Sequence, residues 1–338
     1  MTYLVWRQYR LQWAIALGLL AAFAAVELVD GLHMASQWHS MLTACAGTAG
    51  TAQAGPGSCF GLSIDSVIGN DFRILSVMVP GLVGMLWGAP LIAHEIEAGT
   101  TTFGWTQGIT RARWLVSKVG IALLSAAVWA GVVSALVTWW SGPENAQRAN
   151  SFQPNYFDTQ GIAPIGYAVF AMALGITAGA LLRRTIPAIA VTFGAFVGVR
   201  LWFDDSIRPH LMTPVTTITS LTSTWSPSGA FWGLGTATLN AAGQNVSGSG
   251  PTMTVDGGFA STSVPAACQS AVTAPGVGGP PHGDPLLSCL SKLGYHSSVT
   301  YQPASRYWAF QGIETGIYVA VAAALLAVAF YAVHRRDA

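Results

Sequence analysis

The chain has 338 residues, of which 9% are charged and 52% are hydrophobic. A soluble domain carries roughly 25% charged residues, so this composition excludes an ordinary soluble domain and predicts a membrane protein. The formal net charge is +1, which excludes the basic surface of a nucleic-acid-binding protein, and no run of like charges predicts a disordered arm.

Six apolar segments are long enough to cross a bilayer, whose hydrocarbon core of about 30 Å needs about 20 residues of helix. The first resembles a secretory signal, but it contains Glu27 and no convincing cleavage site follows, so we expect a retained helix. We therefore predict a single all-α polytopic domain over residues 1–338. The expected spans are residues 11–29, 74–93, 114–140, 162–182, 186–203 and 307–333.

Arginines cluster on one side of this six-helix arrangement. By the positive-inside rule, that side is the cytoplasm, and both termini lie there. Residues 94–113 then form a cytoplasmic loop, and residues 204–305 form a large extracytoplasmic loop between helices five and six. The clustered arginines are Arg7, Arg10, Arg111, Arg113, Arg183, Arg184, Arg335 and Arg336.

Before the first span, Trp6-Arg-Gln-Tyr-Arg-Leu-Gln-Trp13 alternates aromatic and cationic residues. This pattern is typical of a helix that lies in the membrane interface. A simple anchor of aromatic residues is the alternative interpretation.

The outer loop is rich in Gly, Ser, Thr and Pro, but residues 211–234 differ because they contain Trp225, Phe231 and Trp232. This stretch is too broken for a span and apolar enough to dip into the membrane. Backbone at that depth must be buried in protein, so we predict a re-entrant or interfacial pair of half-helices there.

All four cysteines fall in segments assigned to the exterior: Cys45, Cys59, Cys268 and Cys289. Two disulfides are expected in an oxidising exterior, and pairing within each loop is the simplest of the three connectivities. Four free thiols are the alternative.

The loop at residues 94–113 begins with His94-Glu-Ile-Glu-Ala98, which resembles part of a zinc-protease motif. That motif needs a second histidine where Ala98 stands. The sequence also contains no Gly-x-x-x-x-Gly-Lys-Ser/Thr phosphate loop. We therefore expect no catalytic residue, no metal site and no cofactor in this chain, and any nucleotide energy must come from another subunit.

Glu95 and Glu97 stand at the carboxyl end of the second span, where the helix dipole disfavours acids, so they need cations nearby. Gly99 can adopt the left-handed conformation that ends such a helix. Thr100 can then cap a short surface helix, in which Phe103 and Trp105 face the bilayer or a partner. A polar turn neutralised by Arg111 and Arg113 is the alternative.

Three motifs in this region resemble a known family: Glu97-Ala-Gly-Thr100, Thr106-Gln-Gly-Ile-Thr-Arg111 and Arg113-Trp-Leu-Val-Ser-Lys118. They are similar to the cytoplasmic loop of bacterial ABC exporter permeases of the six-helix, type-two ABC class. The entry to the last helix, from Tyr301 to Glu314, is similar to that class as well. The long outer loop with its cysteines departs from the pattern and leaves the substrate class open.

The resemblance implies an exporter subunit in the bacterial plasma membrane. A second copy of the chain would complete the pathway, and two copies of an ATP-binding subunit would supply ATP and Mg²⁺. The surface helix near residues 101–110 would be a coupling helix, and the substrate would be an amphipathic drug, antibiotic, peptide or lipid. The implied coupling residues are Trp6, Arg7, Arg10, Glu95, Glu97, Gly99, Thr100, Phe103, Trp105, Arg111 and Arg113.

Three ionisable residues lie within the predicted spans: Glu27, Arg200 and Glu314. Charge inside a membrane is costly, so we expect a functional or paired role for each. Arg200 can pair with Glu27 or with Glu314, either as a static structural pair or as an outer gate or substrate contact. Two other functions stay open: a secondary transporter coupled to protons through Glu314 or Glu27, and a sensor or assembly protein whose outer loop binds a ligand.

Overall fold

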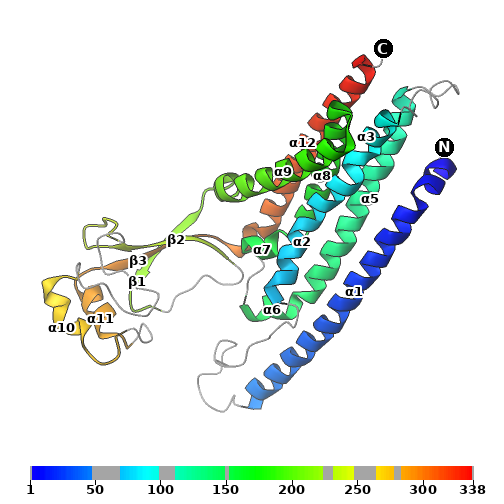
Figure 1. Cartoon of the computed structure of the whole chain (residues 1–338). Helices are drawn as coiled ribbons and strands as arrows, with labels where there is room; N and C mark the ends of the chain where they lie inside the picture. The colour runs from blue at the N-terminus through cyan, green and yellow to red at the C-terminus, as the bar shows by residue number, and fades with distance from the viewer. Residues whose placement is uncertain are drawn as a thin grey trace. The chain divides into compact units, whose positions relative to one another are not determined.

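The computed structural model describes residues 2–47, 69–98, 111–148, 152–223, 231–246, 264–277 and 283–336. The chain divides into two compact units, which are treated separately below (Figure 1). Unit 1 comprises Met1–Leu211 and Tyr307–Ala338, and unit 2 comprises Met212–Arg306.

Unit 1 is helical. Six described helical segments are long and apolar enough to cross a membrane: Leu17–Thr43, Ser76–Glu97, Leu115–Trp140, Ala163–Leu182, Thr185–His210 and Ala304–His334. The first three residues of the last segment belong to unit 2, and the rest of it belongs to unit 1. This confirms the predicted polytopic α-helical architecture. The elements are α1 (Thr2–Gly47), α2 (Gly69–Val83), the π-helix η1 (Gly84–Gly88), α3 (Ala89–Glu97), α5 (Arg111–Trp140), α6 (Gly142–Arg148), α7 (Pro154–Phe157), α8 (Ala163–Leu182), α9 (Thr185–Trp202), the π-helix η2 (Phe203–Ile207), the 3-10 helix η3 (Arg208–His210) and α12 (Tyr307–Arg336).

The first span is longer than the sequence predicts. α1 is one continuous helix, beside α5 in Figure 1, and its apolar segment runs over Leu17–Thr43 rather than residues 11–29. The prediction ended early because Glu27 and Asp30 interrupt the apolar run, yet both are buried, and Asp30 accepts a hydrogen bond from Trp140 Nε1 at 2.8 Å. Residues 6–13 continue the same helix, so no separate interfacial helix precedes the span.

α8 lies at the centre of unit 1 and packs against α12, α5, α3, α9 and α2. Fifteen of its 20 residues are buried, and nine of these are glycine or alanine. A Cβ atom placed on Gly175 would lie 2.3 Å from the Gly84 carbonyl oxygen, and one on Gly179 would lie 2.5 Å from that of Ala89. Only glycine permits this approach, which brings α8 against η1 and α3.

Unit 2 contains a three-stranded antiparallel sheet in the order β1-β3-β2, formed by β1 (Val215–Ser220), β2 (Trp232–Leu239) and β3 (His296–Gln302). Val215 pairs with Tyr301, and Trp232 pairs with Gln302. The prediction of half-helices at residues 211–234 is therefore wrong for the described part, because the threonine-rich, β-branched Val215–Ser220 suits a strand. Trp225 lies outside the described residues.

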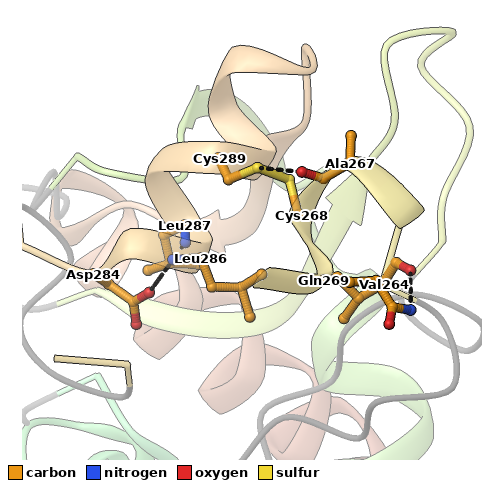
Figure 2. The surroundings of a disulfide bond; sticks show 8 residues. All are labelled: Val264, Ala267, Cys268, Gln269, Asp284, Leu286, Leu287 and Cys289. Atoms are coloured by element: carbon orange, nitrogen blue, oxygen red, sulfur yellow. Dashed lines mark hydrogen bonds between the residues drawn. A yellow bond between two sulfur atoms is a disulfide. The ribbon is translucent and has the colours of Figure 1, made fainter. Parts of the chain in front are cut away.

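Short helices complete unit 2: η5 (Ala266–Cys268), α10 (Gln269–Val272), α11 (Pro285–Lys292) and η6 (Ala304–Arg306). Cys268 and Cys289 form a disulfide, as the pairing within the loop predicts (Figure 2). Asp284 caps α11 by accepting hydrogen bonds from the backbone N–H groups of Leu286 at 2.8 Å and Leu287 at 3.1 Å. Cys59 and the side chain of Cys45 lie outside the described residues.

Replacing both Cys268 and Cys289 with serine is expected to loosen unit 2. The bond closes a loop with a sequence separation of 21 residues, and such a constraint stabilises the folded state by about 3 kcal/mol. Limited proteolysis in detergent should cut near residues 264–295 severalfold faster, while the unit 1 helices keep their resistance. Equal cleavage rates would contradict this expectation.

Candidate functional site

A group of charged side chains, all but one of them buried, lies among the elements at one end of α8, α9 and α12. We call it the charge cluster, and it consists of Asp158, Arg200, Asp204, Arg208 and Glu314. Arg208 is 1% exposed and Glu314 is 0% exposed. Charged groups this deeply buried need close partners of opposite sign.

Arg200 contacts all three acids of the charge cluster. Its Nη2 atom lies 2.7 Å from Asp158 Oδ2 and 3.2 Å from Asp204 Oδ2, and its Nη1 atom lies 3.1 Å from Glu314 Oε1. The guanidinium also stacks over the Tyr167 ring, 3.8 Å from its centroid. Arg200 therefore gains both ion pairs and a cation–π contact.

Arg208 is the second cation of the charge cluster. Its Nε atom donates to Glu314 Oε2 at 2.9 Å, and its Nη2 atom lies 2.7 Å from Glu314 Oε1, which makes a two-pronged contact. The same Nη2 atom lies 2.5 Å from Asp158 Oδ1 and 2.8 Å from Asp204 Oδ1. Paired donors on one carboxylate fix its orientation as well as its charge.

Local sequence places three of these residues together. Arg200, Asp204 and Arg208 follow one another at intervals of four, a spacing that puts side chains on one helical face. α9 continues into η2 and η3, so this face persists past the regular helix. The sequence interpretation assigned Asp204 and Arg208 to the outer loop, whereas the apolar span includes them.

Gln311 holds the segment that carries Asp158. Its Oε1 atom accepts from the backbone N–H of Ile162 at 3.0 Å and of Ala163 at 2.7 Å, at the start of α8. Its Nε2 atom donates to the carbonyl oxygens of Phe157 and Gln160, each at 3.1 Å. The turn between α7 and α8 is thereby fixed on α12.

Tyr167 and Tyr318 complete the surroundings. The Tyr167 hydroxyl donates to Glu314 Oε1 at 2.6 Å, and Arg200 Nη1 donates to the Tyr318 hydroxyl at 3.3 Å. The two rings meet edge to face at 5.0 Å between centroids. These tyrosines satisfy polar atoms of the cluster while their rings join the apolar interior.

Asp158 lies outside the apolar spans but is buried. Burial by itself raises the pKa of its carboxyl, and the neighbouring Arg208 and Arg200 guanidiniums outweigh that effect and hold the pKa below its ordinary value. The stability that this carboxylate contributes is thus fully present at neutral pH and is lost as the pH falls through its depressed folded-state pKa.

The three carboxylates could in principle hold a metal ion, because oxygen atoms of Asp158, Asp204 and Glu314 lie within 4.8 Å of one another. Each of them, however, has guanidinium nitrogens of both arginines within 3.2 Å. The arginines therefore occupy the place that a cation would take. We interpret the cluster as an ion-pair network.

Of the two partners considered for Arg200, the structure pairs it with Glu314. Glu27 is buried on α1, whose main contacts are with α5 and α6, and it lies inside the first span rather than near its end. Sequence reasoning missed Asp158, Asp204 and Arg208. The regular spacing of Arg200, Asp204 and Arg208 was the signal that could have revealed the last two.

At the other end of the spans, the acids of the predicted coupling loop contact residues of this chain. Glu95 forms an ion pair with Lys118, which is 6% exposed and thus buried. Glu97 Oε2 accepts two hydrogen bonds from Thr185, from its backbone N–H at 3.1 Å and from its hydroxyl at 2.7 Å. Glu95 thus has a cationic neighbour as expected, while Glu97 meets the start of another helix.

Arg113 is exposed on α5. Gly99, Thr100, Phe103 and Trp105 lie outside the described residues, as do the side chains of Trp6, Arg7, Arg10 and Arg111.

A small cleft opens between α2, α5 and the start of α8 and reaches Asp158 and Thr159. Its volume is about 30 Å³, enough for about two water molecules and far below that of a drug-sized ligand site. Apolar residues such as Val79, Trp129 and Val133 line most of it.

Comparison with known proteins identifies one family model, described as ABC-2 membrane transporter related, which matches residues 17–208. The match covers more than half of the chain, from the first span through Arg208. No curated protein and no solved structure matches the chain.

Proposed function

Because the chain belongs to the ABC-2 membrane transporter related family, we propose that it is the membrane subunit of an ATP-driven exporter that works as a pair with a second copy of itself. Two copies of a separate ATP-binding subunit would supply ATP and Mg²⁺, and the substrate would be an amphipathic drug, antibiotic, peptide or lipid. The complex would lie in the bacterial plasma membrane.

One observation carries the proposal: the family match covers the first five spans, including the connection between the second and third. That connection leaves the second span after Glu97 and enters the third at Arg111. The predicted coupling residues Phe103 and Trp105 belong to it. Large aromatic side chains of this kind are enriched at the energetic centres of protein interfaces.

The charge cluster supports a transport role for the same scaffold. It joins α9, α12 and the turn before α8 through ion pairs at one end of the spans. We propose that these elements move as one body, with the cluster serving as a structural lock near the outer face. The cleft beside Asp158 admits only water. The substrate path of the proposed pair would lie between the two copies.

Co-expression with an ATP-binding subunit from the same organism tests this function. The tagged chain should retain that subunit in detergent, and the purified complex should hydrolyse ATP. Replacing both Phe103 and Trp105 with alanine should weaken retention by roughly tenfold or more, as expected for interface hot spots. Replacing the exposed Ile218 of unit 2 with serine is the matched control and should change nothing.

A second candidate function is proton-coupled transport through Glu314 or Glu27. One observation favours Glu314 over Glu27: Glu314 belongs to the charge cluster, whose three carboxylates and two guanidiniums leave one negative charge that a proton on one of the three acids could balance. An experiment in proteoliposomes distinguishes ATP-driven export from proton-coupled transport: a pH gradient is imposed, and the movement of an amphipathic fluorescent dye is followed. Dye movement driven by the gradient without ATP-binding subunit would contradict the exporter proposal, and no vectorial movement under either condition would favour a ligand-sensing role for unit 2.

A further inference from the structure

We propose that Glu97 is a positioning residue that transmits motion of the cytoplasmic loop to α9 within the permease, and does not contact the ATP-binding subunit. The inference rests on the proposed function and assigns a specific task to one residue of the loop. It also predicts which helix receives the motion.

The contact at the cytoplasmic end is specific. Glu97 is the last residue of α3, and Thr185 is the first residue of α9. Among the described residues, Arg184, the N-cap of α9, makes no side-chain hydrogen bond to the helix start. Glu97 supplies that cap from another helix, and its negative charge meets the positive end of the α9 dipole.

Close packing makes α3 and the first part of α9 move together. The buried alanines Ala89, Ala93, Ala178 and Ala188 form one apolar cluster across α3, α8 and α9. Side chains this small leave little room for the helices to slide independently. A displacement at the end of α3 is therefore delivered to α9 by packing and directed by the Glu97 contact.

α9 then carries the displacement to the charge cluster. It runs without interruption from Thr185 to Trp202, and Arg200 lies 15 residues beyond Thr185, about 22 Å along the helix. At the far end, Arg200 contacts Asp158 and Glu314. α9 is thus fixed at both ends, to the end of the second span at one and to α12 at the other.

The test uses the full chain with its ATP-binding subunit in nanodiscs. A cysteine introduced at the exposed Ser206, just beyond Arg200 on η2, reports motion through its rate of reaction with a polar maleimide. We compare the rate of maleimide labelling in ATP plus vanadate with the rate in the absence of nucleotide. In the chain that carries only the cysteine at position 206, called the parent, the ratio of these two rates should differ from one. In the Glu97→Ala and Thr185→Val variants, this labelling ratio should return to a value within about twofold of one. Thr185→Ser retains the hydroxyl that Glu97 accepts from, so this variant should keep the ratio of the parent.

Two further measurements separate this role from a general structural one. Glu97→Ala should retain the ATP-binding subunit as well as the parent does. In the chain alone, backbone amides at the start of α9 should exchange hydrogen severalfold faster in Glu97→Ala, and those in the middle of α8 should not change. Loss of the subunit from Glu97→Ala, unchanged exchange, or an unchanged labelling ratio would each overturn the proposal. A parent chain that retains no ATP-binding subunit would overturn the proposed function, and the proposed role of Glu97 would fall with it.

Discussion

Replacement of Arg208 with methionine is expected to destabilise unit 1 by about 3–5 kcal/mol, because removing one partner of a buried ion pair leaves uncompensated charge. Arg208 is 1% exposed and contacts Asp158, Asp204 and Glu314. Arg200 remains, but one guanidinium cannot balance three carboxylates, of which Asp158 and Glu314 are buried. Thermal unfolding in detergent, followed by circular dichroism, measures the loss.

A lysine at position 208 should recover only part of this stability, because an ammonium group cannot make the two-pronged contact with Glu314. Replacing the exposed Arg184 with methionine provides the control in the same unit and should shift the midpoint very little. If Arg208→Met unfolded at the same temperature as the Arg184→Met control, the ion pairs of the charge cluster would not contribute to the stability of unit 1.

Replacement of Gly175 with alanine is expected to destabilise unit 1 by about 1–3 kcal/mol, the usual effect of overpacking a closely packed interior. The added methyl group would lie 2.3 Å from the Gly84 carbonyl oxygen and 2.7 Å from the Ala89 nitrogen. Both neighbours are backbone atoms, so the helices themselves must separate. The midpoint of thermal unfolding should fall accordingly.

Gly194 provides the matched control, because nothing lies within 4 Å of the methyl group that alanine would add there. Alanine in a helix interior is favoured over glycine by about 0.5–1 kcal/mol, so Gly194→Ala should be neutral or stabilising. The opposite signs of two identical chemical changes would show that contact, and not helix propensity, decides the outcome at Gly175. Two variants with the same sign would refute this account.

Several features of the fold could be predicted from the sequence because they follow from local composition. An apolar run of sufficient length predicts a span wherever it occurs, and six were expected and found. The predictions were wrong where the local pattern of apolar residues did not match the element that formed. The buried acids of α1 shortened the predicted first span, and the apolar stretch after η3 was taken for half-helices although Val215–Ser220 is a strand.

The candidate site divides in the same way. The high cost of intramembrane charge identified Arg200 and Glu314 as a candidate pair, which the structure joins at 3.1 Å. Asp158 could not be predicted, because it lies in a turn that reaches the cluster only through the attachment of Gln311 to the neighbouring backbone. For Glu97, helix polarity predicted the need for a compensating positive charge but not its source, which is the start of α9.

The sequence by itself determined that the chain has six segments long and apolar enough to cross a membrane and that its charges are few and concentrated, because hydropathy and charge are properties of each segment alone. The tertiary structure decided which charges meet, since Arg208 lies 50 positions from Asp158 and 106 from Glu314 and meets both only after the helices pack. It also decided that Gly84 and Gly175 must be glycines, because that requirement comes from the distance between two backbones.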